Sequence, residues 1–164
     1  MTAALFSLTL AAALGAGVIA GVFFAFSSFV MPALARLPSA SGIAAMQSIN
    51  VTVLNRLFLS VFAGTALFSS IVAALSMFSW SLSSSKLRIA GSALYVIGTF
   101  FATMARNVPM NNALDKISPD TAQAVQMWSH FVPRWTTWNT VRTVAALGGA
   151  ACLILALIQS ARGD

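Results

Sequence analysis

Charged side chains are scarce in this sequence. It has nine lysine and arginine residues and three acidic residues among 164, so 7% of the chain is charged, whereas soluble domains carry roughly 25%. The charges are also segregated, because none precedes Arg36 and none lies within 57–85, 89–105 or 143–161. So few charges cannot cover a water-facing surface. This excludes an ordinary soluble domain and indicates that lipid surrounds most of the chain.

Metal-binding and redox-active side chains are also scarce. Cys152 is the single cysteine, which excludes an intrachain disulfide and a thiolate metal cluster, and His130 is the single histidine, which excludes haem held by two histidines of one chain. No glycine-rich phosphate loop and no nucleophile elbow occurs. We therefore expect no metal site and no cofactor. The net charge of +6 comes mostly from basic residues beside apolar segments, which favours lipid headgroups over nucleic acid as partners.

Long apolar segments dominate what the sequence does contain, and 59% of its residues are hydrophobic. Segments near 4–31, 57–79, 88–105 and 141–160 have about the 17–25 residues that a helix needs to cross a bilayer. They predict an all-α fold: a four-helix transmembrane bundle that forms a single integral-membrane domain over 1–164. A polar cap is expected from 32–56 and 106–140. The first segment has no basic start and is longer than a signal peptide, so we expect a retained helix.

Four spans place both termini on one side of the membrane. The basic residues divide almost evenly between the two sides, but some of those opposite the termini are candidates for a site. We therefore expect an integral protein of the cytoplasmic membrane with its termini in the cytoplasm. Gly17, Gly21 and Ala25 are four residues apart and form a smooth stripe that favours close packing of spans. Whether the protein is a homo-oligomer is left open.

The connections between the spans contain helix signals. No proline follows Pro38, so residues 39–56 are expected to run into the second span as one long helix. Pro109 is expected to end the third helix. Ser118 and Pro119 suit the start of an extra amphipathic helix between spans three and four, and Pro133 is expected to end it.

Polar side chains gather at the end of the bundle opposite the termini. The non-terminal asparagines, glutamines and aspartates, the histidine and three of the four tryptophans fall in or beside 32–56 and 106–142. An ordinary collar of interfacial residues would be shared between both ends of the spans. This asymmetry indicates a functional site.

Four residues of the last span define one face of its helix. Trp135, Trp138, Asn139 and Arg142 are spaced i, i+3, i+4 and i+7. An arginine this far along a membrane helix should face the bundle interior. Asn139 and Arg142 are therefore candidate catalytic residues, and the two tryptophans are candidate substrate contacts. The alternative is an interfacial tryptophan belt with arginines that reach toward the headgroups.

Other segments supply further candidates at the same end. His130 is the only side chain that ordinarily titrates near neutral pH, so it is a candidate general base, although it also suits an exposed helix. Arg56 is expected to approach Arg142 and form a cationic pocket that suits a flat ligand which is or becomes anionic, such as a phenolate. The remaining candidates for substrate binding are Trp128, Asn50, Asn55, Asn107 and Asn111.

Three stretches together resemble one known family. They are "GVFFAFSSFVMPAL" at 21–34, "NVPMNNAL" at 107–114 and "WTTWNTVRT" at 135–143. In content and order they resemble the small four-span membrane proteins called anthrone oxygenase-like. The resemblance implies a membrane-embedded oxygenase that uses O2, without an obvious cofactor, to oxidise an anthrone-type or other phenolic aromatic substrate. It would assign Arg142, Arg56 and Asn139 to stabilising negative charge, and Trp135 and Trp138 to stacking on the rings.

One position departs from the family pattern. Many members have a histidine directly after the Trp-Asn pair, where this chain has Thr140. If that histidine is the family's base, then His130 would have to replace it. A second hypothesis is therefore a non-enzymatic membrane protein that binds a lipid, a small aromatic ligand or a partner protein through its polar end. A transporter is least favoured, because no proline-broken span crosses the bilayer centre.

Overall fold

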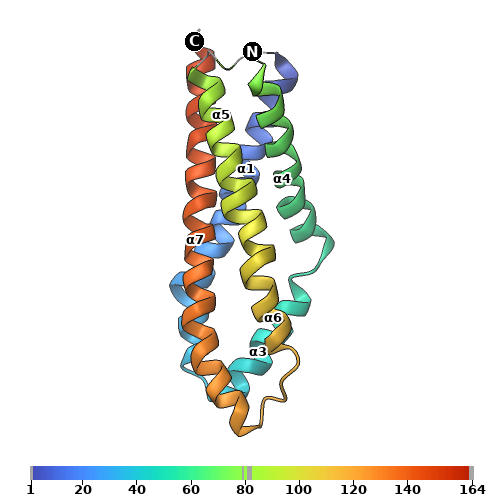
Figure 1. Ribbon diagram of the computed structural model, residues 1–164, viewed down its shortest axis with the longest axis vertical. Helices are drawn as coiled ribbons and strands as arrows, with labels where there is room; N and C mark the ends of the chain where they lie inside the picture. The colour runs from blue at the N-terminus through green and yellow to red at the C-terminus, as the bar shows by residue number, and fades with distance from the viewer. Residues whose placement is uncertain (1, 79, 81–82, 163–164) are drawn as a thin grey trace.

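The computed structural model of the protein describes residues 2–78, 80 and 83–162. Over these residues the fold is all-α, and four long helices stand side by side (Figure 1). Both termini lie at the same end of the bundle. Each long helix is apolar enough to cross a membrane, and the four extend over Ala3–Ala35, Arg56–Met77, Ser83–Leu114 and Ala122–Ala161. The expectation of an all-α fold with four apolar spans is confirmed.

Two of the long helices contain π-helical segments, marked η. Such turns are rare and are frequent at functional sites. The elements in chain order are α1 (Ala3–Ala25), η1 (Phe26–Val30), α2 (Met31–Ala35), α3 (Ser39–Thr52), α4 (Arg56–Met77), α5 (Ser83–Ala93), η2 (Leu94–Phe101), η3 (Thr103–Asn107), α6 (Val108–Leu114) and α7 (Ala122–Ala161).

The predicted extra helix between spans three and four is not a separate element. Thr121 caps the start of α7, its side chain accepting from the backbone N–H of Ala124, and α7 then continues through Pro133 to Ala161. The rings of Trp128, Phe131 and Trp135 stack in sequence across the proline, with centroids 5.6 and 6.4 Å apart. This packing on both sides of Pro133 holds the helix together despite its missing backbone donor.

Two further expectations about the connections are wrong. α3 and α4 are separate, because Asn55 accepts from the N–H of Phe58 at the start of α4 and donates to the carbonyl of Thr52 at the end of α3. Pro109 does not end the third helix but lies in the first turn of α6. The π-helical turn of η3 precedes it and already disrupts the regular hydrogen-bond ladder, so the missing N–H costs less there.

Glycine allows a close approach between α5 and α7, but not through the predicted stripe. A Cβ atom on Gly91 would lie 2.8 Å from the carbonyl oxygen of Gly149, and one on Gly149 would lie 2.9 Å from that of Gly91. Small residues let membrane helices pack this closely. Gly17 and Gly21 have open space where their side chains would be, so the predicted stripe does not pack inside the bundle.

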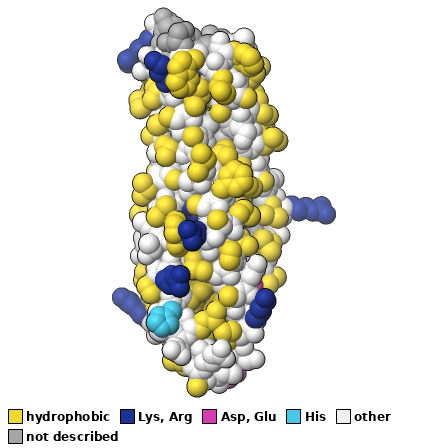
Figure 2. Space-filling model, in the orientation of Figure 1, with side chains coloured by type: hydrophobic (Ala, Val, Ile, Leu, Met, Phe, Trp, Pro, Cys, Tyr) yellow, Lys and Arg dark blue, Asp and Glu magenta, His cyan; other side chains and the backbone are white. Residues whose placement is uncertain are grey.

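The helix lengths place the bilayer along the bundle. The 22 residues of α4 span about 33 Å, which matches a hydrocarbon core of about 30 Å, between Arg56 and the Lys86 region. On the face shown in Figure 2, a broad apolar band without lysine or arginine lies between the dark blue side chains at the top and those farther down the bundle. The 40 residues of α7 span about 60 Å, so α7 extends beyond the bilayer at the end opposite the termini.

Candidate functional site

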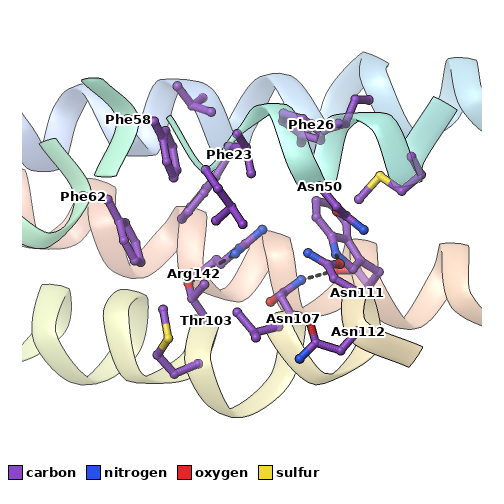
Figure 3. Close-up of a pocket in the computed structure, with 18 of the residues that line it drawn as sticks. Phe23, Phe26, Asn50, Phe58, Phe62, Thr103, Asn107, Asn111, Asn112 and Arg142 are labelled. Atoms are coloured by element: carbon purple, nitrogen blue, oxygen red, sulfur yellow. Dashed lines mark hydrogen bonds between the residues drawn. The ribbon is translucent and has the colours of Figure 1, made fainter. Parts of the chain in front are cut away.

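A cavity of about 190 Å³ lies where α4 begins, in the half of the bundle opposite the termini. α1, η1, α3, α4, η3, α6 and α7 all contribute to its wall. Figure 3 shows their side chains around one space. The lining residues are mostly apolar, and the polar or charged ones are Asn50, Thr103, Asn107, Asn111, Asn112, Asp115 and Arg142.

Arg142 reaches the cavity from α7 and is 5% exposed. Its guanidinium donates to Oδ1 of Asn139 at 3.0 Å from Nε and 2.8 Å from Nη2, and to Oγ1 of Thr103 at 3.2 Å from Nη1. The guanidinium carbon also lies 3.9 Å from the ring centre of Phe23 and 5.1 Å from that of Trp135. All four partners are neutral, so their contacts hold the cation in place without cancelling its charge.

Asn139 fixes the position of Arg142 relative to the first helix. It is fully buried, and its Nδ2 donates to the carbonyl of Phe23 and to Oγ of Ser27, both at 2.6 Å. Its Oδ1 accepts from the guanidinium of Arg142. Thr140, next in the chain, is 2.9 Å from Oγ of Ser27 through its Oγ1. Asn139 therefore orients Arg142 from behind, and Thr140 belongs to the same contact between α7 and η1.

Three of the four asparagines that line the cavity are held by hydrogen bonds within the protein. Asn107 is 1% exposed and donates from Nδ2 to the carbonyl of Trp135 at 3.3 Å. Oδ1 of Asn111 accepts from the indole N–H of Trp135 at 2.7 Å. Nδ2 of Asn50 donates to Oδ1 of Asp115 at 3.2 Å. Among the described residues that line the cavity, Asp115 is the one carboxylate.

Phenylalanines form the apolar wall of the cavity. None of them was among the site residues predicted from the sequence. Phe58 and Phe62 of α4 stack with centroids 5.8 Å apart, and Phe23 meets Phe62 edge-on at 6.3 Å. Phe26 packs against Trp135 at 5.7 Å. Phe23 and Phe26 lie within one of the three stretches that carry the family resemblance, which was the available signal for them.

Of the eleven candidate site residues, Asn50, Asn107, Asn111, Trp135 and Arg142 line the cavity, and Asn139 supports it from behind. The other five lie elsewhere. His130 and Arg56 are exposed, so Arg56 does not join Arg142 inside the bundle as expected. Asn55 caps α4.

Two tryptophans also lie away from the cavity wall. Trp128 is buried in the stack with Phe131 in the cap. The half-buried Trp138 carries the guanidinium of Arg106 over its ring at 4.6 Å. Among the described residues, no group of three or more His, Cys, Asp or Glu side chains is placed to hold a metal ion.

The fold and the cavity define a small four-helix integral membrane protein with an aromatic-walled cavity beside a buried arginine. The chain belongs to the anthrone oxygenase family, whose model matches residues 53–152. This confirms the resemblance found in the sequence. No curated protein and no solved structure matches the chain. The matched residues include Asn107, Trp135, Asn139 and Arg142, whereas Phe23 and the α3 side of the cavity lie outside the match.

Proposed function

We propose that the protein is an oxygenase that uses O2 to oxidise an anthrone-type or other phenolic aromatic substrate in this cavity. The observation that carries the proposal is the setting of Arg142. A buried cation, whose partners among the described residues are neutral, faces a space walled by aromatic rings. Removing a charge from water is costly unless it is paired. An aromatic anion would supply the missing negative charge and also match the apolar wall.

The chemistry of an anthrone fits such a site. Loss of a proton from its central methylene gives a delocalised, phenolate-like anion, and this anion can pass an electron to O2. Joining of the resulting radical and superoxide forms a C–O bond. Protonation of the peroxide and loss of water then leave a second carbonyl. One O2 therefore converts the CH2 group to C=O and releases one H2O. The protein needs to take the first proton, orient the ring and stabilise negative charge.

The cavity suggests which side chain takes the proton. His130 and Asp115 are both exposed, but Asp115 lines the cavity and His130 does not. Asn50 orients that carboxylate through its hydrogen bond to Oδ1. We therefore assign the general base to Asp115 in place of His130. Arg142 then faces the oxygen on which the charge of the anion collects.

The volume of the cavity is compatible with part of a ring system. An engineered apolar cavity of about 150 Å³ holds benzene, so about 190 Å³ admits one ring and its substituents. The exposed lining residues Leu54, Leu59 and Met104 show that the space is open on one side. A substrate of two or three fused rings would insert its reacting end and leave the remainder in this opening.

The experiment uses the protein in lipid nanodiscs, supplied with anthrone under air. Quinone absorbance and O2 uptake are followed together. We expect one O2 consumed per quinone, and a loss of about 100-fold or more in kcat for Arg142→Gln, the scale seen when one stabilising donor is removed. Asp115→Asn should lower kcat as well, while His130→Ala, a matched control at an exposed position, should not. Quinone formation no faster than in empty nanodiscs would exclude the oxygenase.

A further inference from the structure

Asn107 carries an acceptor that the protein leaves unsatisfied. Its side chain is 1% exposed and lines the cavity. No donor among the described residues reaches its Oδ1. Buried polar atoms in folded proteins almost always have a hydrogen-bond partner, so an exception inside a ligand cavity needs an explanation.

The orientation of this amide follows from its other contact. Nδ2 of Asn107 donates to the backbone carbonyl of Trp135, and a flipped amide would set two oxygen acceptors against each other. The carbonyl end of the side chain is therefore the end without a partner among the described residues. The neighbouring Asn111 is different, because the indole N–H of Trp135 already occupies its Oδ1.

The missing donor must come from what fills the cavity. We propose that Oδ1 of Asn107 accepts a hydrogen bond from a hydroxyl group of the aromatic ligand. The site thus selects ring systems that carry a free hydroxyl in addition to the oxygen that faces Arg142. This inference rests on the proposed function for the aromatic class of the ligand. The hydroxyl requirement itself comes from Asn107.

The helix spacing also limits where that hydroxyl lies. Thr103 contacts Arg142, and Asn107 follows it four residues later in the same helix. Four residues make just under one turn of this π-helical segment, and one turn of helix rises by about 5 Å. The two polar groups of the ligand are therefore separated by about the distance between substituents on opposite sides of one ring.

The test measures binding, with probes that are not oxidised at the site. The probes are 6-hydroxy-1-tetralone and 6-methoxy-1-tetralone, two-ring ketones that differ in the hydroxyl donor and in one methyl group. Calorimetry with protein in nanodiscs, corrected with empty nanodiscs, gives each dissociation constant. We expect wild-type protein to bind the hydroxy ketone about tenfold or more tightly than its methyl ether, because the ether leaves Oδ1 of Asn107 unpaired. Equal affinities would mean that a water satisfies Asn107, and would overturn the proposal.

Two variants test whether the preference for the hydroxy ketone depends on Asn107. Asn107→Leu has nearly the same shape without the amide, so the affinity ratio should fall to about one. Asn111→Leu removes a neighbouring amide of the same cavity and should keep the ratio, whatever it does to overall affinity. A preference that survives Asn107→Leu would also overturn the proposal. If Asn107→Leu does not fold, judged by its melting temperature, the wild-type comparison alone decides.

These results are independent of turnover. A hydroxyl preference in a protein that fails to oxidise anthrone would contradict the oxygenase and leave the Asn107 assignment standing. Oxidation of anthrone without a hydroxyl preference would contradict the Asn107 assignment and leave the oxygenase standing.

Discussion

The charge of Arg142 depends on one uncharged neighbour. Oδ1 of Asn139 accepts two hydrogen bonds from the guanidinium, and an aspartate in its place would keep those acceptors while adding a negative charge. We therefore expect Asn139→Asp to neutralise the cation and to lower kcat for anthrone about tenfold or more, the direction expected when charge stabilisation is lost. It should also lower the melting temperature, because its second oxygen would face the carbonyl of Phe23. O2 uptake and the melting temperature check this. A variant with unchanged kcat would show that the free charge of Arg142 is not used.

Asn139 is also a structural residue, and a second substitution separates the two roles. Asn139→Leu removes the acceptor from Arg142 and the donor from the carbonyl of Phe23. Because both groups are buried, we expect a loss of about 2–3 kcal/mol in the free energy of unfolding. The measurement is the SDS-induced unfolding curve of the purified protein. An unchanged curve would contradict the importance of these hydrogen bonds for stability.

Part of the site could be predicted from residue spacing. The i, i+4, i+7 pattern correctly placed Trp135, Asn139 and Arg142 on one side of α7, because polar residues stand out in an apolar helix. Trp138 lies at the edge of that face, about 60° from Trp135 by helix geometry, and packs instead against Arg106. The phenylalanines of α4 could not be found in this way, because an apolar residue in an apolar span does not stand out.

Among the elements, the junction between α3 and α4 depends on Asn55. Its side chain caps the start of α4 and also bonds the end of α3, and it does not line the cavity. Loss of an N-cap residue typically costs about 0.5–2 kcal/mol. We expect Asn55→Ala to lower the melting temperature. Asn55→Asp should lower it less, because it keeps the acceptor for Phe58 and loses only the donor to Thr52. Both variants should keep the wild-type kcat. A fall in kcat without a change in melting temperature would instead support the substrate-binding role predicted from the sequence.

The existence of the helices could be predicted better than their ends. Long charge-free stretches define spans directly, since lipid leaves few alternatives. Prolines misled the prediction at both Pro109 and Pro133, because packing and π-helical turns compensate for a missing donor. The π-helical segments themselves have no sequence signature of the kind used here, yet η1 and η3 supply Phe26, Thr103 and Asn107 to the cavity.

For the whole molecule, the charge pattern and the helix lengths define one position in the bilayer. The charge-free band runs from the level of Arg56 to that of Lys86, so the cavity lies at its edge and α3 with the first turns of α7 lies beyond it. A substrate of low solubility in water is concentrated in the membrane, and the exposed apolar residues Leu59 and Met104 line the cavity where it reaches the surface of the bundle.

Spin labels on α7 test this position. In a Cys152→Ala background, a label at Ser129 should be relaxed by a water-soluble nickel chelate, and a label at Leu147 should be relaxed by O2, which concentrates in lipid. Both residues are exposed on the bundle surface, so they differ mainly in depth. Their separation of 18 residues corresponds to about 27 Å along the helix, which is nearly the thickness of the hydrocarbon core. If O2 were the stronger relaxant at both positions, the start of α7 would lie within the bilayer, and the cavity would be a buried site instead of one at the membrane boundary.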